Sequence, residues 1–215
     1  MYIGRIVAAG MTRDGRAAAG YRVSSRSFPN RTAKLIGEKV SILPRAGFES
    51  DLAKNPYIAY NCLRLSGKIA LVTNGSQTDP IIEKIIAGMN LRDAFALGLL
   101  AMDYEKDSLN TPRIAAAVDV EKCIAVLGIV RHDALLVREF PLEPGKILYL
   151  STYEKNAPCA QNCDTSFDAA DADALCAYMI SGGVFADFEK PVTAASALWN
   201  GSGYSLSVAD AKIEA

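Results

Sequence analysis

The segment Tyr21–Arg31, with the sequence YRVSSRSFPNR, contains three arginines, three serines and one asparagine in eleven residues. Arginine binds phosphate through two parallel charge-assisted hydrogen bonds, so this composition is typical of a site for a phosphorylated small molecule. In an extended strand, Arg22 and Arg26 would share a face and lie about 13 Å apart. They would therefore hold different parts of one nucleotide-sized ligand, or converge through a bend near Pro29. The plain alternative is a charged strand and loop in solvent.

The segment continues a predicted β-hairpin, and further strands are predicted along the chain. The expected strands are residues 2–9, 17–24, 34–43, 58–65, 68–73, 113–119, 123–130, 134–140, 146–152 and 204–208, with a short segment at 191–198. The hairpin at 58–73 begins with NPYIAYNC and is followed by NGSQTD. Polar residues at both ends of a strand pair indicate a site at one rim of a sheet.

Helices are predicted at Asp79–Gly88, Asn90–Tyr104 and Ser166–Ile180. The second is apolar on most faces, which is typical of a helix between two layers. It leads into MDYEKD, where carboxylates would meet the negative end of the helix dipole at a cost of about 0.3–1 kcal/mol each. Either tertiary structure overrides this cost, or the helix has already ended. The pattern as a whole predicts one α+β domain over residues 1–215, with sheets and helices in layers.

Composition limits the functions that are possible. The chain has 215 residues and a net charge of −1, so we expect no nucleic-acid partner and no anionic membrane partner. No apolar run of about 18 residues and no signal peptide is present, which predicts a soluble, cytoplasmic protein. Five scattered cysteines predict reduced thiols. With Cys159 and Cys163 as a lone pair and His132 as the single histidine, we expect no metal site.

Several sequence blocks together resemble the archaeal-type IMP cyclohydrolase family, from Met1 to about Ala195. The blocks are MYIGRI, YRVSSRSFPNR, NPYIAYNC, NGSQTD, GMNLRDA, AMDYEKDSLNTPRIAA, STYE and PVTAA. The resemblance implies a four-layer αββα sandwich similar to N-terminal-nucleophile hydrolases, but without the N-terminal nucleophile, in agreement with Met1-Tyr2. It also implies a homo-oligomer, with a tetramer as the expected form. Two departures stand out: Gln77 replaces a histidine that is frequent in the family, and Cys159–Asp164 and the tail after Asn200 match no family block.

The activity implied by the resemblance is cofactor-free ring closure of a purine ribotide: formyl-AICAR loses water and becomes IMP. The enzyme would orient two groups of one substrate, stabilise an oxyanion and transfer protons. For catalysis the predicted residues are Arg22 or Arg26 for the oxyanion, Glu105 or Asp103 for the amide proton, and Tyr60 for the departing oxygen. The residues predicted to bind the substrate are Asn61 and Asn74 at the carboxamide, and Arg26, Ser27, Asn30 and Arg31 at the phosphate, with Arg113 as a reserve candidate there. Asp79 is predicted to bind the ribose hydroxyls, unless it is simply a helix cap.

Two alternatives stay open at this point. An amidohydrolase on the same fold would use Ser25 or Cys62 as a nucleophile and release formate. A non-catalytic sensor would bind the ribotide through the same arginines and form no product.

Overall fold

The computed structural model describes residues 1–212, and within them the chain forms two antiparallel sheets. The first sheet has the strand order β11 (Cys163–Asp164), β10 (Lys146–Ser151), β1 (Ile6–Met11), β2 (Ala17–Ser24), β12 (Pro191–Trp199) and β13 (Tyr204–Asp210). The second has the order β3 (Arg31–Ile36), β4 (Lys39–Pro44), β5 (Tyr60–Ser66), β6 (Ile69–Thr73), β7 (Arg113–Asp119), β8 (Ile124–Arg131) and β9 (Ala134–Pro141). The helices are α1 (Asp51–Lys54), the 3-10 turn η1 (Pro56–Ile58), α2 (Thr78–Ile86), α3 (Leu91–Met102), α4 (Ala172–Ser181) and the 3-10 turn η2 (Gly183–Asp187).

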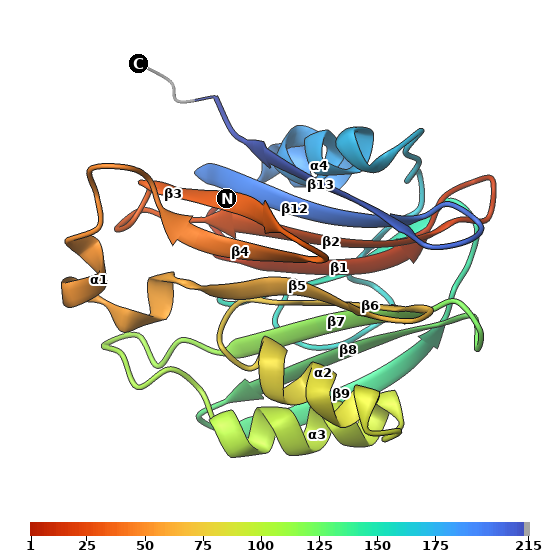
Figure 1. Cartoon of the computed structure of the whole chain (residues 1–215), viewed down its shortest axis with the longest axis horizontal. Helices are drawn as coiled ribbons and strands as arrows, with labels where there is room; N and C mark the ends of the chain where they lie inside the picture. Colours follow the sequence, from red (N-terminus) through yellow and green to blue (C-terminus); the bar gives the residue numbers. More distant parts are fainter. Residues whose placement is uncertain (213–215) are drawn as a thin grey trace.

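The two sheets pack face to face, and helices cover their outer faces (Figure 1). Helix α4 covers the first sheet, and α2 and α3 cover the second. Three apolar clusters fill the spaces between these layers, with Val7, Tyr21 and Leu127 in the cluster between the sheets. The α+β class predicted from the sequence is confirmed, and the helices do form outer layers.

Strand β2 shows how the layers place side chains. All eight of its residues are buried, because both of its faces are covered. Since side chains alternate along a strand, Tyr21 and Val23 point into the core between the sheets, whereas Arg22 points under α4. Gly20 lies against Met179 of α4, and a Cβ atom there would come within 2.6 Å of the Met179 sulfur. A small residue at this position lets helix and sheet approach closely.

Most predicted strands and hairpins are confirmed, including the four strands between residues 113 and 152. The prediction of a single strand at 34–43 is wrong: the chain reverses at Gly37, whose φ of 61° suits glycine, and forms the β3–β4 hairpin. The predicted helix at 166–180 begins only at Ala172, where Asp171 caps its first turn. Helix α3 ends at Met102, and Asp103, with a φ of 53°, is its C-cap residue, so the helix has ended before the acidic residues, as one of the two alternatives predicted.

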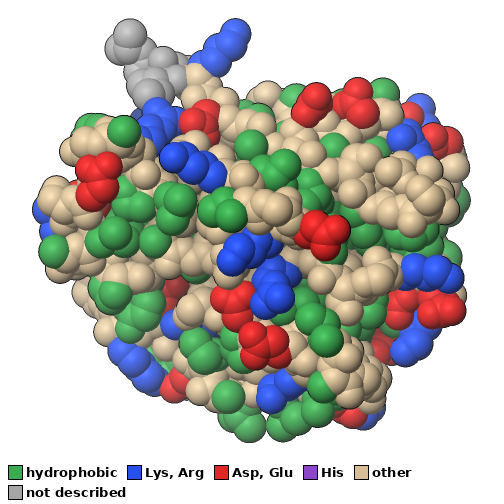
Figure 2. Space-filling model, viewed as in Figure 1, with side chains coloured by type: hydrophobic (Ala, Val, Ile, Leu, Met, Phe, Trp, Pro, Cys, Tyr) green, Lys and Arg blue, Asp and Glu red, His purple; other side chains and the backbone are tan. Residues whose placement is uncertain are grey.

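The surface matches the composition. Figure 2 shows acidic and basic side chains interspersed over one face, rather than gathered into a patch of a single sign. Within residues 1–212, no helix combines the length and apolar character needed to span a membrane.

Candidate active site

A cavity of about 210 Å³ opens where β1 begins. Its walls come from residues 2–5, the loop 24–31 after β2, the start of η1, the loop between α3 and β7, and Tyr153 after β10. Segments belonging to both sheets therefore converge on it. Ligand pockets usually measure about 300–1,000 Å³, so this cavity would enclose part of a nucleotide and leave the rest in its mouth.

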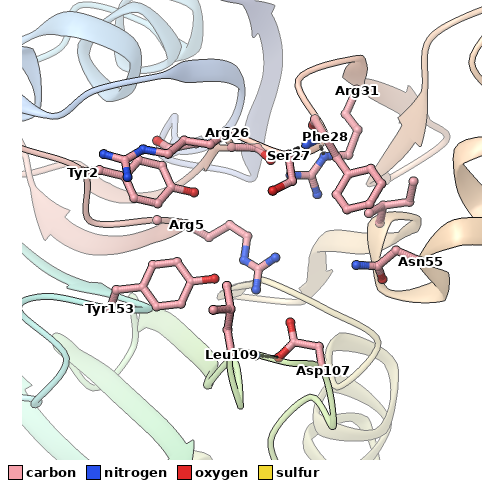
Figure 3. A pocket seen from close by; sticks show the side chains of 14 residues that line it. Tyr2, Arg5, Arg26, Ser27, Phe28, Arg31, Asn55, Asp107, Leu109 and Tyr153 are labelled. Atoms are coloured by element: carbon pink, nitrogen blue, oxygen red, sulfur yellow. Dashed lines mark hydrogen bonds between the residues drawn. The ribbon is translucent and has the colours of Figure 1, made fainter.

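Arg5 occupies the centre of the cavity, with Tyr2 and Arg26 on one side and Asp107 and Leu109 on the other (Figure 3). The preceding Gly4 has a φ of 79°, and a Cβ atom on it would collide with Thr152. Only glycine therefore allows the segment before β1 to lie against Thr152 and Tyr153. This close approach directs Arg5 inwards.

Glu105 holds the guanidinium of Arg5 through an ion pair of 3.2 Å between Nη2 and Oε2. Its side chain is 1% exposed, and its second oxygen, Oε1, has no hydrogen-bond partner within residues 1–212. Burial raises the pKa of Glu105, and the nearby cations Arg5 and Arg113 only partly offset this. A buried carboxyl group with an unused oxygen and a raised pKa is suited to proton transfer.

Arg113 and Gln77 lie next to Glu105. Arg113 donates from Nη1 to Gln77 Oε1 at 3.0 Å, and Gln77 donates to Asn74 at 2.8 Å. A Cβ atom on Gly75 would lie 2.5 Å from Arg113 Nη1, so a glycine is needed for this close packing. Gln77 thus acts as a fixed hydrogen-bond bridge in a buried network, a role that requires no titration.

The loop after β2 contributes the cations expected for phosphate. Arg31 is 2% exposed and donates from Nε to Phe28 O, while its Nη1 has no partner in the described part of the chain. Arg26 is exposed, lies 4.2 Å over the Tyr2 ring and pairs with Glu189. Ser27 lines the same wall. Unpaired guanidinium nitrogens beside a serine hydroxyl form a suitable anion site.

Tyr60 lies behind this wall, 8% exposed, with its hydroxyl 2.6 Å from that of Tyr21. Burial raises the pKa of Tyr60, whereas Arg31 and Arg5 oppose that rise. Both phenols therefore stay protonated at neutral pH and can donate a hydrogen bond.

The chain was compared with known proteins. A family model described as IMP cyclohydrolase-like protein matches residues 2–203. The chain belongs to this family. A Methanocella arvoryzae protein named IMP cyclohydrolase is 50% identical over 210 residues, which cover 97% of this chain and 98% of that protein. A protein of the same name from Methanosphaera stadtmanae is 47% identical over 197 residues, covering 92% and 94%. The resemblance recognised from the sequence blocks is confirmed, and the chain is an enzyme.

The structure corrects the expected placement of Arg22. Its guanidinium lies on the outer side of the first sheet and donates to the carbonyl oxygens of Ile180 at 2.9 Å and Phe185 at 2.8 Å, and also to that of Phe188. Burial lowers the pKa of Arg22 to about 10. Arg22 is not among the described residues that line the cavity, and these carbonyl oxygens and Ser24 Oγ engage its guanidinium, so it is not placed to stabilise an oxyanion there and instead ties α4 and η2 to β2.

Other predicted residues also lie outside the cavity. Asp79 lies on α2 and accepts hydrogen bonds from two residues of β5, Asn61 at 2.9 Å and Arg64 at 2.9 Å. The alternative that Asp79 is the cap of this helix is also wrong, because Gln77 is the capping residue and Asp79 lies in the first turn of α2. Asp103 is half-exposed and pairs with Lys106 at 2.5 Å.

Two predicted binding residues have structural partners instead of a cavity position. Asn74 is fully buried, where it donates to Pro112 O and accepts from Ile114 N, so it holds the start of β7. Asn30 is not among the described residues that line the cavity; its carbonyl accepts from Arg45 N at 2.9 Å. Neither side chain is placed to orient a carboxamide or a phosphate in the cavity.

Five residues that line the cavity were not predicted from the sequence as site residues: Arg5, Tyr2, Asn55, Asp107 and Tyr153. All five belong to blocks that carry the family resemblance: MYIGRI, NPYIAYNC, AMDYEKDSLNTPRIAA and STYE. The position of these residues inside the blocks was therefore the sequence signal that could have identified them. Arg5 was hidden because it is a single cation in an apolar run, and because its partner Glu105 is 100 residues away.

Proposed function

We propose that this enzyme closes the pyrimidine ring of formyl-AICAR to give IMP. The observation that carries the proposal is a cavity lined by Arg5, Arg26 and Arg31, in which the guanidinium of Arg5 is paired with the buried carboxylate of Glu105 behind it. Relatives named IMP cyclohydrolase that align over nearly the whole chain support it. From the membership of the family we also propose a single domain whose layers resemble those of N-terminal-nucleophile hydrolases. We propose that it acts in the cytoplasm as a homo-oligomer, with a tetramer as the first form to test.

The reaction needs no external nucleophile, because the substrate carries both reacting groups. The carboxamide nitrogen attacks the formyl carbon, a C–N bond forms, and the carbonyl electron pair moves onto the formyl oxygen. That oxygen takes one proton from the amide nitrogen. The C–O bond then breaks as a C=N bond forms, the formamide nitrogen gives up its proton, and water leaves.

We assign to Arg5, in place of Arg22, the stabilisation of the negative charge on the formyl oxygen. Its guanidinium points into the cavity and is kept charged: burial opposes the charge, but Glu105 and nearby tyrosines raise the pKa of Arg5 above its usual value. A fixed cation in a partly dry site stabilises negative charge as it develops. Glu105 is assigned the transfer of the amide proton, since its Oε1 is unpaired within residues 1–212.

Arg31, Arg26 and Ser27 are assigned the phosphate, with the unpaired Nη1 of Arg31 as the main contact. Tyr60 is assigned the donation of a proton to the departing oxygen, through a hydroxyl that Tyr21 orients. Because Tyr60 lies behind Arg5 and Arg31, this step requires the substrate to reach past the two guanidinium groups.

Incubation of the purified protein with formyl-AICAR, followed by chromatographic identification of the product, tests the proposal. IMP is the expected product. AICAR with free formate would instead support the amidohydrolase alternative, although Cys62 is a poor nucleophile because burial raises its pKa well above the usual range. Binding of the ribotide without any product would support the sensor.

A further inference from the structure

Asp79, which was predicted to bind the ribose, lies outside the cavity. The ribose of the proposed substrate therefore has no assigned partner. Among the described residues that line the cavity, Asp107 alone carries a carboxyl group. The other charged side chains that line it are those of Arg5, Arg26 and Arg31. A carboxylate among these cations would repel a phosphate, so it must face a hydrogen-bond donor of the ligand.

The carboxylate of Asp107 is fixed by its own loop. Oδ1 accepts from the backbone nitrogens of Leu109 at 3.1 Å and Thr111 at 2.9 Å, and Oδ2 accepts from Thr111 Oγ1 at 2.7 Å. A carboxylate can accept about four hydrogen bonds. One position therefore stays free for a ligand, and its direction is already set by the folded loop.

Asn55 supplies a complementary donor. Its Oδ1 accepts from Tyr57 N at 2.8 Å, whereas its side-chain nitrogen makes no hydrogen bond within residues 1–212. Figure 3 shows Asn55 and Asp107 on the side of Arg5 that lies away from Tyr2 and Tyr153. A free acceptor and a free donor on the same side of the cavity match adjacent hydroxyl groups, one of which donates while the other accepts.

We propose that Asp107 and Asn55 form the ribose subsite, and that Asp107 makes the enzyme select ribonucleotides over deoxyribonucleotides. An acidic side chain that binds a ribose hydroxyl is a general solution in dinucleotide-binding proteins. The order of groups across the cavity is consistent with this: Arg31 and Ser27 for the phosphate, Asp107 and Asn55 for the ribose, and the tyrosines for the planar base. This inference rests on the proposed function for the identity of the ligand.

Calorimetric titration of the full-length protein with IMP, 2′-deoxy-IMP and 3′-deoxy-IMP tests the subsite. The wild-type protein is expected to bind IMP at least about tenfold more tightly than one of the two deoxy analogues, as for the loss of one hydrogen bond to a charged group. In Asp107→Asn this ratio is expected to fall at least threefold. Asp14→Asn, in the turn between β1 and β2 at the far end of β1 from Arg5, is the matched control and keeps the wild-type ratio.

Equal affinities of the wild-type protein for all three nucleotides would overturn the subsite, as would an unchanged ratio in Asp107→Asn. If Asp107→Asn fails to fold, equal wild-type affinities still overturn the subsite, and Asn55→Ala, which removes the proposed donor, is expected to lower the wild-type ratio in its place. The outcome is also separate from the proposed function. A protein that forms IMP but ignores the ribose hydroxyls refutes only the subsite, and one that selects IMP over its deoxy analogues but forms no product refutes only the ring closure.

Discussion

Arg5 immediately precedes β1 and Arg22 lies on the neighbouring strand β2, yet their surroundings are opposite. Ile6, which follows Arg5, pairs directly with Arg22 in the β1–β2 ladder. Arg22 is fully buried beneath α4, and its guanidinium donates to backbone carbonyls of the α4–η2 segment. Arg5 has one carboxylate partner and faces a cavity, and its Nε has no partner within residues 1–212. A guanidinium whose nitrogens all donate to protein oxygens stabilises the fold, whereas one with an unpaired nitrogen beside a cavity is available to a ligand.

Replacement of Arg5 gives the largest expected effect on catalysis. Arg5→Met should lower kcat for IMP formation by about 10²- to 10³-fold, which is typical for loss of an oxyanion donor. Steady-state kinetics with formyl-AICAR measure this, and circular dichroism checks that the variant is folded. Turnover close to wild type would remove Arg5 from the mechanism.

Replacement of Arg22 should instead reduce stability. Arg22→Met leaves several buried carbonyl oxygens without a donor, at about 1–3 kcal/mol for each group that water cannot reach. We expect the free energy of unfolding to fall by about 3 kcal/mol, measured by urea denaturation, while kcat per folded molecule stays within about threefold of wild type. A variant with wild-type stability but a strongly reduced kcat would show that Arg22 acts in the active site.

Replacement of Arg31 tests the phosphate site. Arg31→Met should weaken IMP binding by about 10- to 100-fold, because a charge-assisted hydrogen bond contributes about 1.5–3 kcal/mol. The binding of inosine, which lacks the phosphate, should change little. If both ligands lose affinity equally, Arg31 supports the cavity wall and does not bind phosphate.

Glu105 gives a pH-dependent prediction. Its pKa in the folded state is raised by burial, so its contribution to stability is present below about pH 4.5, the usual value, and is lost as the pH rises through the raised pKa. The wild-type protein should therefore become less stable relative to Glu105→Gln as the pH rises from 4 to 8. Parallel denaturation curves over this range provide the measurement, and a constant difference would show that the carboxyl group does not titrate there.

The smallest effect is expected on the outer face of the second sheet. Asp79→Asn weakens a partly exposed pair with Arg64, which should cost no more than about 1 kcal/mol and leave kcat within about twofold of wild type. A tenfold loss of kcat would place the active site elsewhere.

The sequence predicted the α+β class and most of the hairpins, because these depend on local turns and periodicity. It also pointed to Arg26, Ser27 and Arg31, which line one cavity, and to Glu105, which pairs with Arg5 beside it; their roles in binding and catalysis stay proposals. It could not give the direction of Arg22, since a strand with two covered faces is buried on both sides and its pattern does not distinguish them. Arg5 escaped because its role depends on Glu105, a contact that only the tertiary structure creates.

A crystal structure of the complex with IMP tests most directly whether the cavity at the start of β1 is the active site. We expect the phosphate within hydrogen-bonding distance of Arg31 Nη1, and the purine ring beside the guanidinium of Arg5. Electron density for IMP at any other position, with this cavity left to solvent, would contradict it.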